Sequence, residues 1–263
     1  MKIAVLIGHG KGDSGGYDPG ACSNGYQEYQ LGREIGKYAA DALRAAGHTV
    51  DLLNYDGKYN LPERIAYCNA RRYDLVAEVH LNAGKGTGCE VYHSIGDSKG
   101  RELAAAVSAA VSSALSIRDR GARTKANSAG TDYFGIIRQT KACALLIETC
   151  FIDSGDVAKV ATNAGRKVAG EAVAAGIVRV VGRVAVEPPK PKAESYAVKI
   201  GMFNRLEDAK ETADRLTALE FYNEVKQDGA QWYVLVYSFT NKDKADALAW
   251  VMNNQRYTVV QSR

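Results

Sequence analysis

The sequence is short of cysteine, of long apolar runs and of export signals. Its five cysteines are odd in number and include no C-x-x-C pair, which is typical of reduced thiols in a cytoplasm. No apolar run approaches the length of a membrane span, and the stretch Ile3–Ile7 is too short for the core of a signal peptide. We therefore expect a protein that is made in the cytoplasm without a signal peptide and that has no membrane span.

A strong excess of positive charge is also lacking. The net charge is +4, and residues 195–263 hold nine basic and nine acidic side chains. A neutral segment does not attract a polyanion by charge. The glycine-rich loop from Gly8 to Gly20 lacks the Gly-Lys-Ser/Thr ending of a phosphate loop. These absences argue against nucleic acids and nucleotides as partners.

Proline is scarce, and three of the five prolines lie between Val186 and Lys192. Because proline breaks both helical and strand patterns, this stretch is typical of a semi-rigid linker. We predict a first domain over residues 1–184, a Pro/Lys-rich linker over residues 185–194 and a second domain over residues 195–263.

The first domain alternates strand-like apolar runs with long amphipathic patterns. We expect strands over residues 3–7, 48–54, 75–81, 90–92 and 142–149 and near Ile136, and helices over residues 27–46, 62–72, 100–115 and 156–180. This alternation predicts an α/β fold with a mostly parallel, twisted sheet flanked by helices.

The second domain contains an internal repeat. Tyr196–Phe203 aligns with Trp232–Phe239 at an offset of 36 residues, which predicts a small α+β sandwich of βαββαβ order. Strand alternation assigns one set of side chains to its core, namely Val198, Ile200, Val234 and Val236. It assigns a second set to the open face of the sheet, namely Lys199, Tyr233, Leu235 and Tyr237.

Four polar residues stand at the ends of predicted strands or helices, namely His9, Glu28, His80 and Glu148. The carboxyl edge of an α/β sheet can bring such distant residues together. A hydrolytic zinc site needs three ligands, an open position and a further carboxylate that moves a proton. The two histidines and Glu28 would supply the ligands, and Glu148 the carboxylate. Taken singly, each is more often an ordinary hydrogen-bonded residue, and Glu28 an acid favoured by the helix dipole.

These residues belong to an ordered series of motifs. The series consists of Ile7-Gly8-His9-Gly10, Gly25-x-x-Glu28-x-x-Leu31, Leu61-x-x-Arg64 with Asn69, His80-x-Asn82-Ala83, Gly88-x-Glu90-Val91, Arg120-Gly121, Ile137-Arg138 and Leu146-x-Glu148-Thr-Cys-Phe151-Ile152. In this order it resembles the zinc-dependent N-acetylmuramoyl-L-alanine amidase family, in the branch that includes phage endolysins and bacterial cell-wall amidases. The resemblance covers about residues 1–180.

The resemblance implies one Zn²⁺ per chain, held by His9, Glu28 and His80, with Glu148 as the catalytic glutamate. It implies peptidoglycan as the partner, with the stem peptide at the catalytic site. Zinc-activated water would hydrolyse the amide bond between N-acetylmuramic acid and the first L-alanine, and Glu148 would shuttle the proton.

Glu78, Asn82 and Arg138 are candidates for contacts behind the ligands or with the substrate. The family often has Asp-Pro before its first Gly-His, where this chain has Leu6-Ile7, so an acid behind a ligand is missing there. Glu78, on the same strand face as His80, would orient a ligand instead, or would be an exposed acid at a strand edge. Arg138 would meet a stem-peptide carboxylate or form an ordinary salt bridge.

The second domain opens with Tyr196-x-Val198-x-Ile200-Gly201-x-Phe203, which resembles the first motif of the SPOR (sporulation-related repeat) family. Members of that family bind peptidoglycan glycan strands, particularly strands stripped of stem peptides. The resemblance implies a glycan strand on the open sheet face, where Lys199, Tyr233 and Tyr237 would meet sugars. The alternatives are a solvated surface or an association face, and the neutral charge argues against RNA.

We therefore expect a zinc amidase of the cell wall, tethered by its second domain. The absence of export signals favours a phage endolysin that reaches the wall through a holin or after cell lysis, with a late-released mother-cell enzyme as the alternative origin. Two other functions stay open. One is an inactive amidase-fold protein that binds or regulates the wall, and the other is a zinc carboxypeptidase or endopeptidase acting on the stem peptide. The sequence carries no signal for an oligomeric state.

Overall fold

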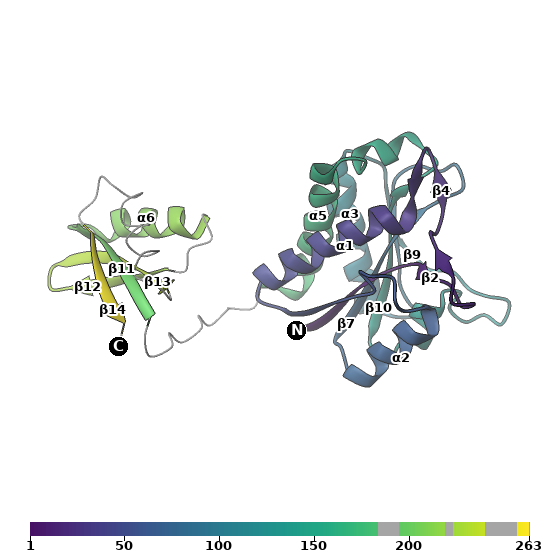
Figure 1. Cartoon of the computed structure of the whole chain (residues 1–263), viewed down its shortest axis with the longest axis horizontal. Helices are drawn as coiled ribbons and strands as arrows, with labels where there is room; N and C mark the ends of the chain where they lie inside the picture. Colours follow the sequence, from purple (N-terminus) through teal and green to yellow (C-terminus); the bar gives the residue numbers. More distant parts are fainter. Residues whose placement is uncertain (184–194, 219–222, 240–256, 263) are drawn as a thin grey trace. The chain divides into compact units, whose positions relative to one another are not determined.

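A computed structural model describes residues 1–183, 195–218, 223–239 and 257–262 (Figure 1). The chain divides into two compact units, Met1–Val186 and Glu187–Arg263. The linker predicted at residues 185–194 lies outside the described residues. In the described part of the chain, no helix is both long and apolar enough to cross a membrane.

The first unit is built on a six-stranded sheet of order β6-β1-β7-β10-β8-β9. Its strands are β1 (Lys2–Ile7), β6 (Thr49–Leu53), β7 (Leu75–Asn82), β8 (Cys89–Tyr92), β9 (Asp119–Arg123) and β10 (Cys143–Phe151). Neighbouring strands run parallel except at the pairing of β10 with β8. The expected α/β fold with a mostly parallel sheet is therefore confirmed.

The two faces of this sheet are covered unequally. One face carries the long helices α1 (Glu28–Ala45), α3 (Ser98–Leu115) and α5 (Asn163–Val181), and α5 contacts both of the others. Among the described elements, the other face carries α2 (Leu61–Arg71), which is labelled in Figure 1, and the short α4 (Gly135–Gln139). Helix α2 begins in a capping box, in which Asn60 and Glu63 each bond the other's backbone N–H.

Strand β7 shows how the unequal cover positions polar groups. Its side chains alternate between the two faces of the sheet, and Ala77 and Val79 pack under the three long helices. Val76 faces the opposite side and is buried with α2 and α4. Glu78, His80 and Asn82 follow on that same side, where Glu78 is buried against Arg64 of α2. The carboxyl end of β7 therefore presents its polar side chains on the thinly covered face.

Several expected elements differ from the structure. The strand predicted near Ile136 is wrong, because Ile136 and Ile137 lie in α4 and both are buried against the sheet. Two adjacent apolar residues fit one helical turn as well as a short strand. The helix predicted over residues 156–180 is split into a 3₁₀ helix, Gly155–Lys159, and α5, which begins after its cap Thr162.

Five short strands were not predicted. They are β9 and the two-residue strands β2 (Gly10–Lys11), β3 (Tyr17–Asp18), β4 (Cys22–Ser23) and β5 (Tyr26–Gln27). Strand β9 is a polar strand at the edge of the sheet, so it lacks the apolar run that marks a buried strand. The other four pair as β2-β3 and β4-β5 and fold the glycine-rich segment between β1 and α1.

The second unit is an antiparallel sheet of order β12-β13-β11-β14. Its elements are β11 (Ser195–Phe203), α6 (Leu206–Ala218), β12 (Asn223–Asp228), β13 (Gln231–Phe239) and β14 (Tyr257–Ser262). The four residues predicted as core, Val198, Ile200, Val234 and Val236, are fully buried against α6. The second helix of the predicted repeat falls in residues 240–256, outside the described residues.

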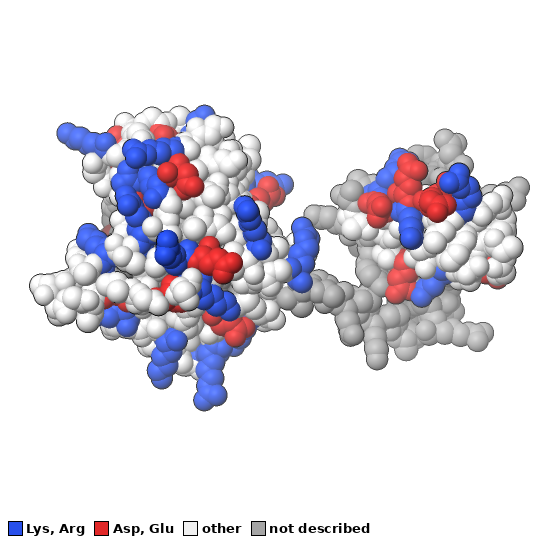
Figure 2. Space-filling model, turned by 180° about the vertical axis from the view of Figure 1, so that it is seen from behind, with Lys and Arg blue, Asp and Glu red and all other residues white. Residues whose placement is uncertain are grey.

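Charge and thiols agree with the expectations from composition. Figure 2 shows acidic and basic side chains side by side on the described face of the second unit. All five cysteines are free thiols. Cys68, Cys89 and Cys150 are buried, whereas Cys22 is exposed.

Candidate functional site

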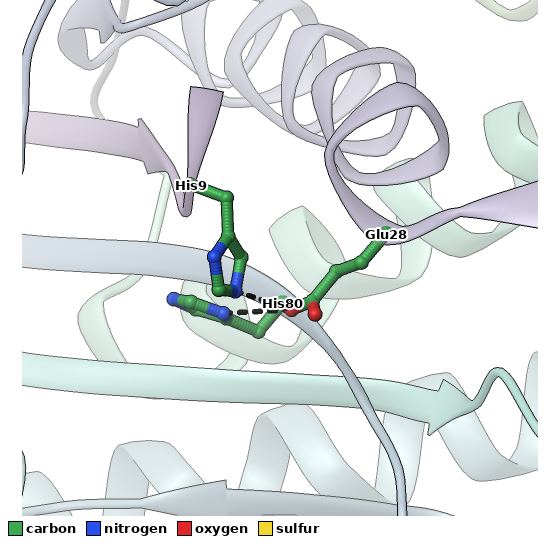
Figure 3. A group of neighbouring side chains, drawn as sticks. All are labelled: His9, Glu28 and His80. Atoms are coloured by element: carbon green, nitrogen blue, oxygen red, sulfur yellow. Dashed lines mark hydrogen bonds and ion pairs between the residues drawn. The ribbon is translucent and has the colours of Figure 1, made fainter. Parts of the chain in front are cut away.

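Three polar side chains meet at the carboxyl edge of the sheet (Figure 3). His9 lies just beyond β1, Glu28 is the first residue of α1, and His80 lies near the end of β7. Glu28 Oε1 is 2.8 Å from His80 Nδ1 and 3.2 Å from His9 Nε2. One ligand atom from each residue lies within 4.8 Å of the other two. The structure therefore brings together the three residues that the motifs single out as metal ligands.

Backbone conformation at the end of β1 makes this approach possible. His9 and Gly10 both have positive φ, 63° and 87°, so the chain turns sharply after the strand. Beside them, a Cβ on Gly8 would lie 2.2 Å from Cε1 of His80, and a Cβ on Gly20 would lie 2.7 Å from Oε2 of Glu28. The glycines of this segment thus leave room for the side chains of the site.

Two further carboxylates contact the ring nitrogens that face away from Glu28. Asp18 Oδ2 is 2.8 Å from His9 Nδ1, and Glu78 Oε2 is 3.2 Å from His80 Nε2. Such contacts fix the tautomer and orientation of a histidine that binds a metal. Sequence reasoning missed Asp18, and the only signal for it was its place in the glycine-rich loop. Asp18 contacts His9 on the ring nitrogen away from Glu28. This is the kind of contact behind a ligand that the Asp-Pro aspartate of the family would make and that Leu6-Ile7 does not supply.

Glu78 is buried, so the alternative that it is an exposed strand-edge acid is wrong. Its side chain is 2% exposed, and its Oε1 accepts a hydrogen bond of 2.9 Å from Nε of the equally buried Arg64. Burial alone would raise the pKa of Glu78, but Arg64 and His80 outweigh burial and lower it to about 2. Glu78 is therefore a charged group between Arg64 and His80.

Glu28 is held from several directions. Its Oε1 accepts a hydrogen bond from the backbone N–H of Leu81, and its Oε2 accepts one from that of Ala21. Burial opposes the charge of Glu28, but the hydrogen bonds from His80 and His9 outweigh it and hold the pKa well below its ordinary range. In the same way, Glu28 and Glu78 outweigh burial at His80 and raise its pKa. The carboxylates and the imidazoles of the cluster thus stabilise each other's charged forms.

Glu148 occupies the next strand across the sheet. Its Cα is in register with that of His80 on β7 and with that of Glu90 on β8. Its Oε2 is buried without a hydrogen-bond partner among the described residues. Burial raises the pKa of Glu148 to about 7, and the Glu28 and Glu90 carboxylates act in the same direction against His80. A buried carboxyl oxygen without a hydrogen-bond partner among the described residues, on the strand next to His80, is a candidate for proton exchange.

Glu90, in contrast, is fully bonded. It accepts hydrogen bonds from Asn82 Nδ2 at 2.8 Å, Tyr92 Oη at 2.9 Å and Arg120 Nε at 2.6 Å. Asn82, a candidate for substrate contact, thus holds Glu90 in this structure. Sequence reasoning quoted Glu90 and Arg120 only as motif positions and did not pair them.

A hollow of about 290 Å³ opens beside the cluster, and His9 and His80 contribute to its wall. Its apolar wall comes from α2, the start of α4 and β10, through Leu61, the cap residue Phe134, Ile136 and Leu146. Arg138, the third candidate, donates hydrogen bonds of 2.7 Å to the backbone carbonyls of Asp132 and Tyr133. It braces the loop before α4, and among the described residues it forms no salt bridge, which was the alternative to contact with a stem-peptide carboxylate.

The open face of the second unit carries two of its three predicted glycan contacts. The Lys199 ammonium lies 4.0 Å from the centroid of the Tyr233 ring and 3.3 Å from Oδ2 of Asp228. The side chain of Tyr237 lies outside the described residues.

The cluster of His9, Glu28 and His80 suits a zinc ion. Two imidazole nitrogens and a carboxylate oxygen are ligands that zinc takes. A carboxylate stands behind each imidazole, and the hollow gives a ligand access to the same edge. Within the described residues no other group of three such side chains comes as close together.

Comparisons with known proteins agree with this architecture. The family model for N-acetylmuramoyl-L-alanine amidase matches residues 3–179, and the model for the SPOR domain matches residues 192–257. The amidase match covers the six-stranded sheet except Lys2, and it includes His9, Glu28, His80 and Glu148.

Named relatives are amidases and an endolysin. N-acetylmuramoyl-L-alanine amidase CwlM of Bacillus licheniformis is 30% identical over 83% of this chain and 80% of its own. The sporulation-specific N-acetylmuramoyl-L-alanine amidase of Bacillus subtilis (strain 168) is 32% identical over 62% of this chain and 61% of its own. The endolysin of Bacillus phage SPP1 is 31% identical over 55% of this chain and 54% of its own.

Solved structures show the same fold. The N-acetylmuramoyl-L-alanine amidase from Clostridium difficile 630 superimposes with a TM-score of 0.60 and 25% identity, covering 69% of this chain and 96% of its own. The catalytic domain of the CD27L endolysin, which targets Clostridia difficile, superimposes with a TM-score of 0.56 and 27% identity, covering 68% of this chain and 97% of its own. The chain therefore belongs to the N-acetylmuramoyl-L-alanine amidase family, carries a SPOR domain after its catalytic domain, and is an amidase of peptidoglycan.

Proposed function

We propose that this amidase is zinc-dependent, with His9, Glu28 and His80 as the zinc ligands and Glu148 as the group that moves protons. It hydrolyses the amide between the lactyl group of N-acetylmuramic acid and the L-alanine of the stem peptide. One observation carries the proposal. A paired cluster of two imidazoles and a carboxylate has, in register on the next strand, a buried carboxyl oxygen without a partner among the described residues.

When bound, zinc supplies Lewis-acid polarisation of the carbonyl and lowers the pKa of water. The chain supplies the rest. Asp18 and Glu78 hold the two imidazoles in one orientation, and Arg64 balances the buried charge of Glu78. Glu148 accepts the proton of the attacking water at its unpartnered oxygen and returns it to the departing amine nitrogen. A carboxyl pKa near 7 suits a group that must both take and give a proton.

Replacement of the proton-moving group tests the proposal directly. We expect Glu148→Ala to lower hydrolysis of purified walls by about 10² to 10⁴-fold, the usual contribution of acid–base catalysis. One zinc per chain should remain bound, because Glu148 is not among the ligands. The matched control is Glu171→Ala, an exposed glutamate of α5 far along the chain from the site. Full activity of Glu148→Ala would contradict the mechanism.

The rival functions give different products. A zinc-free chain that binds walls without releasing peptides would be the inactive wall-binding protein. A carboxypeptidase or endopeptidase would release fragments cut within the stem peptide. The amidase releases whole stem peptides that begin with L-alanine and leaves free lactyl carboxylates on the glycan. Metal analysis and mass spectrometry of a wall digest therefore separate all three.

We propose a phage endolysin as the biological role, which reaches the wall through a holin or after lysis. Similarity to the SPP1 endolysin supports it, although the sporulation-specific amidase is equally similar in sequence. The second domain, through Lys199 and Tyr233, would bind the glycan strand. A gene that stands outside any phage lysis cassette would contradict the endolysin role and leave the mother-cell enzyme.

A further inference from the structure

A pair of arginines lies beyond the catalytic glutamate, on the edge strand β9. Arg120 Nε is 2.6 Å and Arg123 Nε is 3.6 Å from the same oxygen, Oε2 of Glu90. Two guanidinium charges therefore face one carboxylate, and the pair keeps a net positive charge. The proposed mechanism uses neither arginine.

Strand register sets the distance of this pair from the reacting bond. His80, Glu148 and Glu90 occupy one row across β7, β10 and β8. Neighbouring strands lie about 5 Å apart, so Glu90 lies about 5 Å from Glu148. A hydrogen-bond length then separates Glu90 from Arg120, so the arginines begin roughly 7 to 8 Å beyond Glu148. The departing amine nitrogen must lie at Glu148, which protonates it. The hollow lies on the His9 and His80 side of that row and the arginines lie on the other side, so a peptide that runs from this nitrogen away from the hollow reaches the arginines.

Both arginines keep N–H groups that are available to a ligand. The Arg120 side chain is 23% exposed and that of Arg123 is 48% exposed. Nη1 of Arg120 is 3.5 Å from the carbonyl of Thr87, and its Nη2 has no hydrogen-bond partner among the described residues. The Phe151 ring lies 5.1 Å from the Arg120 guanidinium carbon and supports it. A planar guanidinium held in this way is suited to a carboxylate.

The backbone beside Glu90 leaves this place open. Gly121 is in register with Glu90, and a Cβ on Gly121 would meet no atom within 4 Å. A ligand group can therefore lie over β9 next to both arginines without displacing a side chain at that position.

We infer that Arg120 and Arg123 bind the α-carboxylate of the second stem-peptide residue, D-glutamate, and so make the enzyme prefer stems in which that carboxylate is free. D-Glutamate continues the stem through its side chain, which leaves the α-carboxylate as a branch. Two residues span at most about 7 Å, so a carboxylate on residue two reaches the arginines when the amine of residue one lies at Glu148. The inference rests on the proposed amidase function and names a specificity determinant within it.

The test compares two muropeptides, N-acetylmuramoyl tetrapeptides whose second residue is either D-glutamate or its α-amide, D-isoglutamine. For the zinc-loaded full-length protein we expect kcat/KM to be about tenfold higher on the free acid, typical of one charge-assisted hydrogen bond. In Arg120→Gln and in Arg123→Gln this ratio should fall toward one. The ratio is the readout, so an equal loss of activity on both muropeptides leaves it at the wild-type value and counts against the inference. Arg101→Gln, at an exposed position of α3, is the matched control and should keep the ratio.

Each result is decisive. A wild-type ratio near one, or variants that keep the wild-type ratio, would overturn the inference while lactyl-amide cleavage upheld the proposed function. Failure of the wild type to cut either muropeptide at the lactyl amide would instead overturn the proposed function. Arg120 contacts the buried Glu90, so its loss carries a folding risk. The more exposed Arg123→Gln then decides the question by itself.

Discussion

At the scale of single residues, the proposed zinc site depends on the absence of a side chain at Gly8. We expect Gly8→Ala to lower zinc affinity by about 10 to 100-fold, because the new Cβ would lie 2.2 Å from the His80 ring and move it. The matched control is Gly16→Ala, in the same glycine-rich segment, where a Cβ would meet nothing within 4 Å. Metal analysis after dialysis against a weak chelator measures the difference. Equal zinc retention by the two variants would contradict the prediction.

The thiols offer a second residue-scale prediction. Burial raises the pKa of Cys68 and of Cys150 to about 12, and the pKa of Cys143 also rises to about 12. The thiolate is the reactive form, so at pH 8 only about one in ten thousand of these thiols is reactive. Exposed Cys22 should therefore react alone with a thiol reagent in the native protein, and all five should react in denaturant. Rapid reaction of two or more cysteines in the native protein would contradict this prediction.

How far the site follows from the sequence depends on what fixes each residue. His9, His80 and Glu148 each follow an apolar run within a short motif, so their meeting near one edge of the sheet was predictable. Asp18 was not, because its contact with His9 depends on the path of a glycine-rich segment that has no periodic pattern. The contact of Arg120 with Glu90 joins an unpredicted edge strand to a predicted strand, so no spacing in the sequence reveals it.

At the scale of elements, the close approach of α5 to α3 depends on a glycine. We expect Gly176→Ala to destabilise the first unit by about 1–3 kcal/mol, since its Cβ would lie 2.5 Å from Cα of Val107 and force the helices apart. Gly32→Ala in α1 is the control, because its Cβ would find ordinary contacts at 3.7 Å. That change should stabilise by about 0.5–1 kcal/mol through helix propensity.

Calorimetry of the full-length variants tests this pair. About 1 kcal/mol corresponds to roughly 2–4 °C in Tm for a domain of this size. Shifts of the same sign for both variants would contradict the packing argument. The sequence predicted a helix at both glycines but not the element that each glycine faces, because helix periodicity identifies a buried face and leaves the neighbouring element unspecified.

At the scale of the whole molecule, the second domain should matter for walls and not for small substrates. We expect Tyr233→Ala to lower hydrolysis of insoluble walls by about tenfold or more, because a tethered enzyme works at a raised effective concentration of its polymer. Hydrolysis of a soluble muropeptide should not change. Lys210→Ala, on the exposed side of α6, is the control. A parallel loss on both substrates would show that Tyr233 acts through the fold and not through the wall.

The position of α5 has a consequence for synthesis of the chain. Helix α5 contacts both α1 and α3, yet it is the last helix of the catalytic domain to be made. The four residues of the proposed site are all made once Glu148 has been added. Until Val181 follows, the layer over the sheet lacks its middle helix. A nascent chain thus carries every side chain of the proposed site before it can complete the core that holds them, and we expect activity only after translation has passed α5.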